Sequence, residues 1–354
     1  MKRLAEESIS LLRKMVATAS PTFEEAAVAD LIGNALGGWG VGFERFGNNI
    51  VAQCGSTAPD APVLVLDAHI DTVPAAASYT RNPYEPGDDP SVVYGLGSND
   101  DGGSVVSMIA AFRYFKDAQL PFKLILALTC EEEKAGPHGA AWLYSPEGPL
   151  GALGDASVIV GEPTGVRAAV SERGLLVLDG HAAGVSGHAA RGEGVNALYI
   201  ALDDITALRA HEFARESAVM GKVHLSVTQI SAGTAHNVIP DGCDFVVDVR
   251  PTDVYSNEEL VAELQGLCRS ALTPRSLRNR ASATPRGSRL FEAVRSAGLE
   301  EFSSPTTSDW IRVPYPAVKI GPGESSRSHK ADEFILTDEI SRAIETYITL
   351  ISKF

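Results

Sequence analysis

Side chains able to bind a metal ion follow four separate apolar runs of this 354-residue sequence. The runs and the residues after them are VLVLDA before His69, KLILALT before the acidic run 131–133, ASVIVG before Glu162, and AVKIGPG, with a short loop, before His329. Such runs are typical of strands buried in a parallel sheet, whose carboxyl ends share one edge where ligands bind. We therefore expect these side chains to converge, although they are far apart in the sequence.

Asp100 is a fifth candidate, in the glycine-rich segment YGLGSNDDGGSVV just ahead of a predicted helix. Such a loop could also cradle a phosphate, since helix N-termini attract anions. The segment lacks a GKS or GKT ending and GxGxxG spacing, and its two adjacent aspartates would repel a phosphate. We therefore interpret the loop as presenting a carboxylate to a cation.

Histidine and carboxylate ligands without a thiolate are typical of a zinc site, and they also suit cobalt or manganese. Two imidazoles and several carboxylates exceed what one tetrahedral catalytic zinc needs, so a shared carboxylate could hold two metals about 3.5–4 Å apart. Each residue alone has a simpler explanation, because a histidine at a strand end is usually structural and an aspartate in a loop usually caps a helix. Their joint placement at strand ends is what favours a metal site.

The elements that must position these residues begin with two helices. Residues 4–16 carry apolar side chains at helical spacing, and the segment 20–22 breaks this pattern. Thr22 and Glu25 predict a capping box ahead of a second helix that ends near Leu36. The apolar runs that follow are separated by helical segments, which indicates an α/β fold with a mostly parallel, mixed sheet covered by helices.

The segment 174–285 has a different order of elements. It predicts a strand at 175–184, a helix at 196–213, strands at 222–231 and 243–251, a helix at 257–272 and a last strand at 276–284. This βαββαβ order is that of a ferredoxin-like α+β module. Because the sequence then returns to the first pattern, we predict that the module is inserted into one larger metal-binding domain formed by residues 1–173 and 286–354.

The composition limits the partners that the protein can have. A net charge of −15 without a basic patch argues against nucleic acid or an anionic membrane. The N-terminal residues place charges in every helical turn, unlike a signal peptide, and no apolar run approaches the ~20 residues that span a bilayer. The four cysteines form no CxxC pair, as in neither a disulfide framework nor a thiolate zinc site. These features predict a soluble cytoplasmic protein.

A series of motifs occurs in the order seen in one enzyme family. They are HIDTVP at 69–74, the glycine-rich segment 95–103, EEEK at 131–134, GEPT at 161–164, SGH at 186–188, HNVIP at 236–240 and SHKADE at 328–333. On these motifs the chain resembles the dinuclear zinc aminoacylase and carboxypeptidase family, in its acetylornithine deacetylase and succinyl-diaminopimelate desuccinylase branch. The resemblance covers nearly the whole chain, and HxD, EExK and GEPT at these spacings are highly specific.

The resemblance implies a role for each metal-binding candidate. The implied ligands are His69 and His329 for one zinc each, Asp100 as a bridge between both, and Glu133 and Glu162 as one terminal carboxylate each. One or two zinc ions per subunit would be bound, with cobalt or manganese as alternatives.

The resemblance also implies catalytic residues. Asp71, two residues after His69, would orient that imidazole, since alternation along a strand lets both side chains face one side. Glu132 would be the general base that takes a proton from the attacking water and passes it to the leaving amine. His188, in the inserted lid or dimerisation module, would stabilise the oxyanion in the neighbouring subunit of a homodimer. Glu131 has a place in the motif but no predicted role.

Three further residues are predicted to contact the substrate. Asn237 and Arg250 match family positions with this role, the arginine through a carboxylate, although DVRP could equally be an ordinary strand end. Arg327 could hold a carboxylate such as that of a succinyl group, or could simply be exposed. Residues 100–103 read DDGG where many relatives have a D-x-K-G pattern, so a nearby positive charge is missing. His138 is interpreted as a structural residue of a helix after the glutamates.

The resemblance implies a metal-dependent amidohydrolase that removes an acyl group from a small N-acyl amino acid. The compact length and the ending GPGESSRSHKADEF are most similar to N-acetyl- or N-succinyl-ornithine or -citrulline deacylases of arginine biosynthesis. A succinyl-diaminopimelate desuccinylase or a di- or tripeptidase would share the metal centre and is the main alternative. A catalytically dead binding protein on the same fold is a further alternative, against which the presence of Glu132 argues.

Overall fold

The computed structural model describes residues 1–354 and divides the chain into two compact units. The first unit contains Met1–Val170, Ala283–Phe302 and Ser308–Phe354, and the second contains Ser171–Ser282 with Ser303–Thr307. The sequence predicts an insertion at 174–285, close to the observed 171–282.

The short segment 303–307 is predicted in the first unit but belongs to the second. Ser171 Oγ lies 2.8 Å from Ser303 Oγ, and the N–H of Arg173 donates to the carbonyl of Ser304 at 3.2 Å. These bonds join sequence-distant residues, which local patterns do not reveal.

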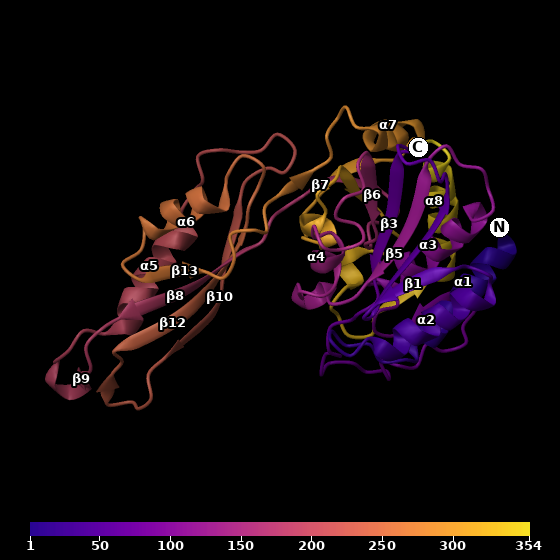
Figure 1. Ribbon diagram of the computed structural model, residues 1–354. Helices are drawn as coiled ribbons and strands as arrows, with labels where there is room; N and C mark the ends of the chain where they lie inside the picture. Colours follow the sequence, from indigo (N-terminus) through magenta and orange to yellow (C-terminus); the bar gives the residue numbers. More distant parts are fainter. The chain divides into compact units, whose positions relative to one another are not determined.

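The first unit consists of helices packed on a nine-stranded sheet (Figure 1). Its helices are α1 (Lys2–Val16), α2 (Ala26–Gly38), α3 (Gly102–Phe115), α4 (Ala140–Leu143), α7 (Arg289–Ser296) and α8 (Thr337–Ile351), with 3₁₀ helices η1 (Glu132–Lys134), η3 (Asp309–Arg312) and η4 (Ser325–Arg327). The strands of the sheet are β1 (Phe43–Phe46), β2 (Asn49–Gly55), β3 (Val63–His69), β5 (Lys123–Thr129), β6 (Ala156–Val160), β7 (Ala168–Glu172), β14 (Ser282–Ala283), β15 (Glu301–Ser304) and β16 (Ala317–Lys319). A separate antiparallel pair joins β4 (Val92–Tyr94) to β17 (Phe334–Leu336).

The sheet is mixed, as predicted, and its parallel part is central. The strand order is β1-β2-β5-β3-β6-β16-β7-β14, with β15 paired to β7. The strands β5, β3, β6 and β16 run parallel to one another, whereas β2 joins β5 and β7 joins β16 in antiparallel pairs. The four parallel strands therefore end at the same edge, which is where the metal-binding candidates begin.

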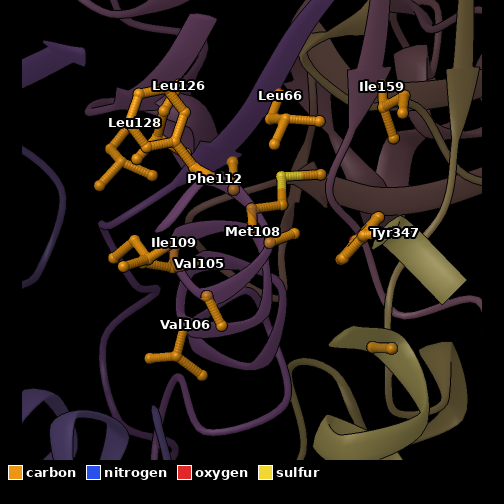
Figure 2. Packing of buried hydrophobic residues seen from close by; sticks show 14 of the residues in the cluster. Leu66, Val105, Val106, Met108, Ile109, Phe112, Leu126, Leu128, Ile159 and Tyr347 are labelled. Carbon is orange, nitrogen blue, oxygen red and sulfur yellow. The ribbon is translucent and has the colours of Figure 1, made fainter. Parts of the chain in front are cut away.

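Both faces of the sheet are covered by helices, and the central strands are accordingly apolar at nearly every position. Leu64 and Leu66 of β3 pack on the side of α1, α2, α3 and α8, whereas Val63 and Val65 pack on the side of α4 and η3. Figure 2 shows Leu66, with Leu126 and Leu128 of β5, beside Met108 and Phe112 of α3 and Tyr347 of α8. This packing fixes the positions of the strand ends.

The second unit has the predicted ferredoxin-like order. Its elements are β8 (Leu176–Ala183), β9 (Gly187–His188), η2 (Ala189–Arg191), α5 (Ala197–Ala210), β10 (His224–Ala232), β11 (Val238–Ile239), β12 (Gly242–Arg250), α6 (Asn257–Gln265) and β13 (Ala271–Pro274). The main sheet has the order β10-β12-β8-β13 with all neighbours antiparallel, and β9 pairs with β11. The unit has its own apolar core, which includes Phe245 and Leu260.

The predicted last strand of the module, 276–284, and the predicted end of its second helix are wrong. The helix α6 ends at Gln265, before Gly266, and the strand that closes the sheet is β13. The side chain of Gln265 donates to the carbonyl of Ser270 at 2.9 Å and accepts from the N–H of Leu272 at 2.8 Å. These two hydrogen bonds hold a turn directly after Gln265, before the predicted end of the helix. Leu272 therefore lies in β13 and not in α6.

The predicted capping box at Thr22 and Glu25 is also absent. Helix α2 begins at Ala26 after Glu25, and the carboxylate of Glu25 accepts the N–H of Phe23 at 2.7 Å. The hydroxyl of Thr22 donates to Asp71 at 2.8 Å instead. A tertiary contact therefore replaces the local cap.

None of the helices of the structure combines the length and apolar character needed to cross a membrane.

Candidate metal centre

Asp100 lies between the two predicted histidine ligands. Its Oδ1 is 3.2 Å from Nε2 of His69, the last residue of β3, and its Oδ2 is 3.7 Å from Nε2 of His329, which follows η4. Each oxygen of one carboxylate thus faces a different imidazole. This is the arrangement that a carboxylate shared by two metal ions requires.

Two groups of three ligand atoms share Asp100. One group is His69, Asp100 and Glu162, and the other is Asp100, Glu133 and His329, and within each group the ligand atoms lie within 4.8 Å of one another. The imidazole of His329 is 2.9 Å from the carboxylate of Glu133. The structure therefore brings together all five predicted ligands at the carboxyl edge of the parallel strands.

Glu132 lies beside both groups and forms a third set with His69 and Glu133. Burial raises the pKa of its carboxyl well above the usual value, which the charge of His69 opposes and nearby acids such as Asp309 reinforce. Burial likewise raises the pKa of Glu162, with a further contribution from Asp100. Acids crowded at one edge repel one another, so a cation there would stabilise their charged forms.

Neighbouring acids raise the pKa values of both histidines. Burial lowers the pKa of His69, but its contacts with Asp100 and Asp71 more than offset this and hold that pKa well above its ordinary value. The hydrogen bond to Glu133 is the main cause that raises the pKa of His329 to about 8. Positive charge is thus favoured beside Asp100 and Glu133.

The residues fit divalent metal ions. Imidazole and carboxylate are the ligands of zinc, cobalt and manganese, and no cysteine belongs to either group. Next to the shared ligand, both carboxylate oxygens of Asp101 are buried without a hydrogen-bond partner. Buried carboxylates are costly without compensating charge, and two cations in the adjoining groups would supply it.

Asp71 connects His69 to the loop that carries the glutamates. Its backbone carbonyl lies 3.0 Å from Nδ1 of His69, and its carboxylate oxygen Oδ1 lies 3.5 Å from that nitrogen. The carboxylate also accepts the backbone N–H groups of Glu132 at 3.0 Å and Glu133 at 3.2 Å. Besides fixing the imidazole, Asp71 therefore anchors the 3₁₀ helix η1.

Glu131 belongs to none of the ligand groups, and its side chain turns to another loop. Its backbone has a positive φ of 63°. Its carboxylate accepts the N–H of His138 at 2.9 Å and lies 3.1 Å from Nδ1 of the same residue. Glu131 therefore connects the segment 136–139 to the end of β5. Its role is structural, and the acidic run in the sequence does not reveal it.

The predicted placement of His138 in a helix is wrong, because the residue lies in the loop before α4. Pro137 lacks an N–H for a helical hydrogen bond. A Cβ at Gly139 would come within 1.8 Å of the carbonyl oxygen of Cys130, so the loop packs directly on the strand end. The contact of His138 with Glu131 is a structural one.

Arg327 is engaged with a neighbouring helix. Its guanidinium donates to both oxygens of Glu339 in α8, at 2.7 and 3.1 Å, and lies over the ring of Phe334. Its side chain is only 19% exposed, so the reading of a simply exposed arginine is wrong. This ion pair supports η4, directly before His329.

Three predicted residues lie in the second unit. His188 is exposed on β9 and accepts the N–H of Ala190 at 3.2 Å, and Asn237 directly precedes β11, whose Val238 lies opposite His188. Arg250 ends β12 and donates to both oxygens of Asp248 at 2.8 and 3.1 Å. The first two are therefore neighbours, and their catalytic or substrate-binding roles remain predictions.

Glu333 is a contact residue that the sequence reasoning did not assign. Its carboxylate accepts backbone N–H groups of the loop that presents Asp100. An acid four residues after His329, in the motif SHKADE, is the signal that could have drawn attention to it.

Comparison with known proteins agrees with this geometry. Residues 65–353 match the family described as Peptidase family M20/M25/M40. The chain is 27% identical, over 95% of its length and 95% of the relative, to an acetylornithine deacetylase of Erwinia tasmaniensis.

Solved structures share the fold of the chain. Aminopeptidase PepT of Bacillus cereus has a TM-score of 0.77 at 17% sequence identity. The YXEP protein of Bacillus subtilis, a dinuclear metal-binding peptidase of the M20 family, has a TM-score of 0.72 at 15% sequence identity. Each comparison covers 99% of this chain and 98% of the other chain. With the family match over most of its length, the chain is a metal-dependent hydrolase of amide bonds that belongs to the M20/M25/M40 peptidase family.

Proposed function

We propose that this enzyme removes the acyl group from an N-acyl amino acid, and that its substrate is N-acetyl- or N-succinyl-ornithine or -citrulline in arginine biosynthesis. The observation that carries the proposal is the pair of ligand groups sharing Asp100, with Glu132 beside them. The similarity to an acetylornithine deacetylase over 95% of both chains supports this substrate class. The donor set supports zinc, with cobalt or manganese as alternatives.

When bound, the metal ions would polarise the amide carbonyl and lower the pKa of the attacking water. Glu132 takes a proton from that water and passes it to the nitrogen of the leaving amine. Asp71 holds the backbone N–H groups of Glu132 and Glu133, so base and ligand keep a fixed spacing. Burial raises the pKa of Glu132, so this carboxylate accepts a proton more readily than an exposed one does, as a general base must.

We also propose roles in a homodimer for three residues of the second unit. We assign to His188 the stabilisation of the oxyanion in the neighbouring subunit, and to Asn237 and Arg250 contacts with the substrate. Arg327 remains a candidate for a substrate carboxylate, although Glu339 now competes for its guanidinium. The four free cysteines suit a reducing compartment, and we propose the cytoplasm.

The main rivals differ in substrate and share the centre. The fold likeness to an aminopeptidase leaves a di- or tripeptidase as the second candidate, and succinyl-diaminopimelate desuccinylase is the third. A catalytically dead binding protein is opposed by the presence of Glu132 next to the ligand groups.

The test is a substrate panel with zinc-loaded protein. It compares acetyl- and succinyl-ornithine, acetyl-citrulline, succinyl-diaminopimelate and a tripeptide by release of free amine. We expect turnover of an ornithine or citrulline derivative, its loss with a chelator, and a reduction of about 10²–10⁴-fold in Glu132→Ala.

A variant of the exposed Glu147, Glu147→Gln, serves as the matched control and should behave like the wild type. Preferential cleavage of the tripeptide would favour the peptidase, and no turnover of any compound would exclude the proposed enzyme. Unchanged turnover in Glu132→Ala would show that the proposed mechanism is wrong.

A further inference from the structure

We infer that Glu333 is the positioning residue for Asp100, the carboxylate shared by the two candidate metal sites, an inference that rests on the proposed metal function. Glu333 is 2% exposed. Its Oε1 accepts the N–H groups of Asn99 at 2.8 Å and Asp100 at 2.9 Å, and its Oε2 accepts the N–H of Gly97 at 3.2 Å. One buried carboxylate therefore fixes the backbone on which Asp100 stands.

The same short segment carries a ligand. Glu333 lies four residues after His329, and its own carbonyl accepts the N–H of Gly95 at 2.8 Å. The next residue, Phe334, pairs with Tyr94 between β17 and β4. The loop of Asp100 and the loop of His329 are thus built against each other and not positioned independently.

Asn99 forms the reciprocal connection. Its side-chain oxygen accepts the N–H of Glu324 at 3.0 Å, and its amide donates to the carbonyl of Glu324 at 3.2 Å and to Ser328 Oγ at 3.3 Å. Glu333 thus reaches from the second loop to the first, and Asn99 reaches from the first to the second. A shift of one loop would displace ligands on both.

The chemistry at Glu333 requires a carboxylate of this length. All three partners are N–H donors, so each needs an acceptor. Glutamine would turn an NH₂ group toward one of them, and aspartate is one methylene shorter. Alanine would leave buried N–H groups unpaired. Loss of residues that orient metal ligands typically weakens metal binding 10–100-fold, and we expect this range for Glu333→Gln.

The experiment measures metal binding directly on the full chain. Wild type, Glu333→Gln and Glu333→Ala are stripped of metal and titrated with Co²⁺, with the dissociation constant taken from calorimetry and the ligand geometry from the visible absorption spectrum. We expect Glu333→Gln to bind Co²⁺ about 10–100-fold more weakly and with a changed spectrum.

Asp204 provides a matched control. It is another buried carboxylate, in the second unit, and it accepts the N–H groups of Arg269 at 3.0 Å and Ser270 at 2.8 Å. Asp204→Asn should lower the melting temperature as Glu333→Gln does, yet bind Co²⁺ like the wild type.

The outcomes separate this inference from the proposed function. Wild-type affinity and spectrum in Glu333→Gln would overturn the role of Glu333 and leave the metal function standing, and so would an equal loss of affinity in Asp204→Asn. Failure of the wild type to bind Co²⁺ would overturn both. If Glu333→Ala does not fold, Glu333→Gln alone decides.

Discussion

Three consecutive glutamates turn their side chains to three different environments. Glu133 faces His329, Glu132 lies near His69 and Glu133, and Glu131 turns to His138. Asp71 keeps the first two in place through their backbone N–H groups. Only Glu131 is separated from the other two acids in this way. The ligand atoms of Glu132 and Glu133 lie within 4.8 Å of each other, so their charges still repel and a cation beside them would stabilise both.

At the residue scale, Asp71→Asn should weaken both metal binding and folding. An amide at this position can accept only one of the two N–H groups of η1 and directs its own N–H at the other. We expect metal affinity to fall about 10–100-fold and the free energy of unfolding to fall by about 1–3 kcal/mol. Calorimetric titration with Zn²⁺ and thermal melting measure the two effects.

Thr22→Val is the control for this prediction. It removes the 2.8 Å hydrogen bond to Asp71 and leaves both bonds to η1 intact. Its metal affinity should therefore stay closer to that of the wild type. Equal affinities for Asp71→Asn and the wild type would contradict the anchoring role.

The candidate ligands could be predicted from sequence, and so could Asp71 beside His69, whereas the supporting contacts of Glu131 and Glu333 could not. His69 and Glu162 follow long apolar runs, and runs of this kind reveal strand ends. The role of Glu131 depends on its positive φ and on the bond of its N–H to Glu25 at 3.3 Å, a residue far earlier in the chain. Such contacts leave no periodic pattern.

At the scale of elements, β10 is an edge strand that leaves one side open. It ends the order β10-β12-β8-β13, and its Ile230 is 49% exposed. In α5 of the same unit, Tyr199 is 65% exposed. Unpaired edges and exposed apolar side chains favour association with another chain. This surface supports the proposed homodimer.

Ile230→Lys should therefore convert the dimer to a monomer, because a lysine on an edge strand opposes pairing with a second edge. Light scattering after size exclusion should give twice the 37.4 kDa chain mass for the wild type and 37.4 kDa for the variant. Leu267→Lys changes an exposed leucine just after α6 in the same way and should remain dimeric. A monomeric wild type would refute the proposal.

Element boundaries were predicted best where the pattern was long and regular. The strand β12 is within one residue of its predicted bounds, because apolar and polar residues alternate along it. The end of α6 was missed because Leu267 and Leu272 continue an apolar pattern beyond Gly266. Side-chain bonds of Gln265 decide that turn, and propensity alone does not reveal them.

At the scale of the whole molecule, the candidate metal ligands are confined to one of the two units. The first unit carries all five candidate metal ligands, whereas the second has its own apolar core and none of these candidates. A ligand that binds only the folded state stabilises it according to its concentration relative to the dissociation constant. Metal should therefore stabilise the first unit selectively.

Removal of metal by a chelator should lower the melting transition of the first unit and leave that of the second unchanged. Stabilisation by metal at 100 times its dissociation constant is about 2.7 kcal/mol. Differential scanning calorimetry with and without chelator tests this, and added Zn²⁺ should restore the first transition. The same thermogram with and without chelator would contradict the metal centre.

The insertion has a consequence for how the chain folds. Strand β16 pairs with β6 in parallel although the second unit separates them in sequence, and the N–H of Thr284 bonds to the carbonyl of Val170 at 2.8 Å where the insertion leaves and rejoins the first unit. The entropy lost on closing a loop grows with its length. Once the inserted unit has folded with its two ends together, the long connection behaves as a short one. Strand β16 can then pair with β6 at a lower entropic cost, and this pairing brings His329 to the edge where the other candidate ligands lie. We therefore expect early folding of the insertion to speed the completion of the metal centre.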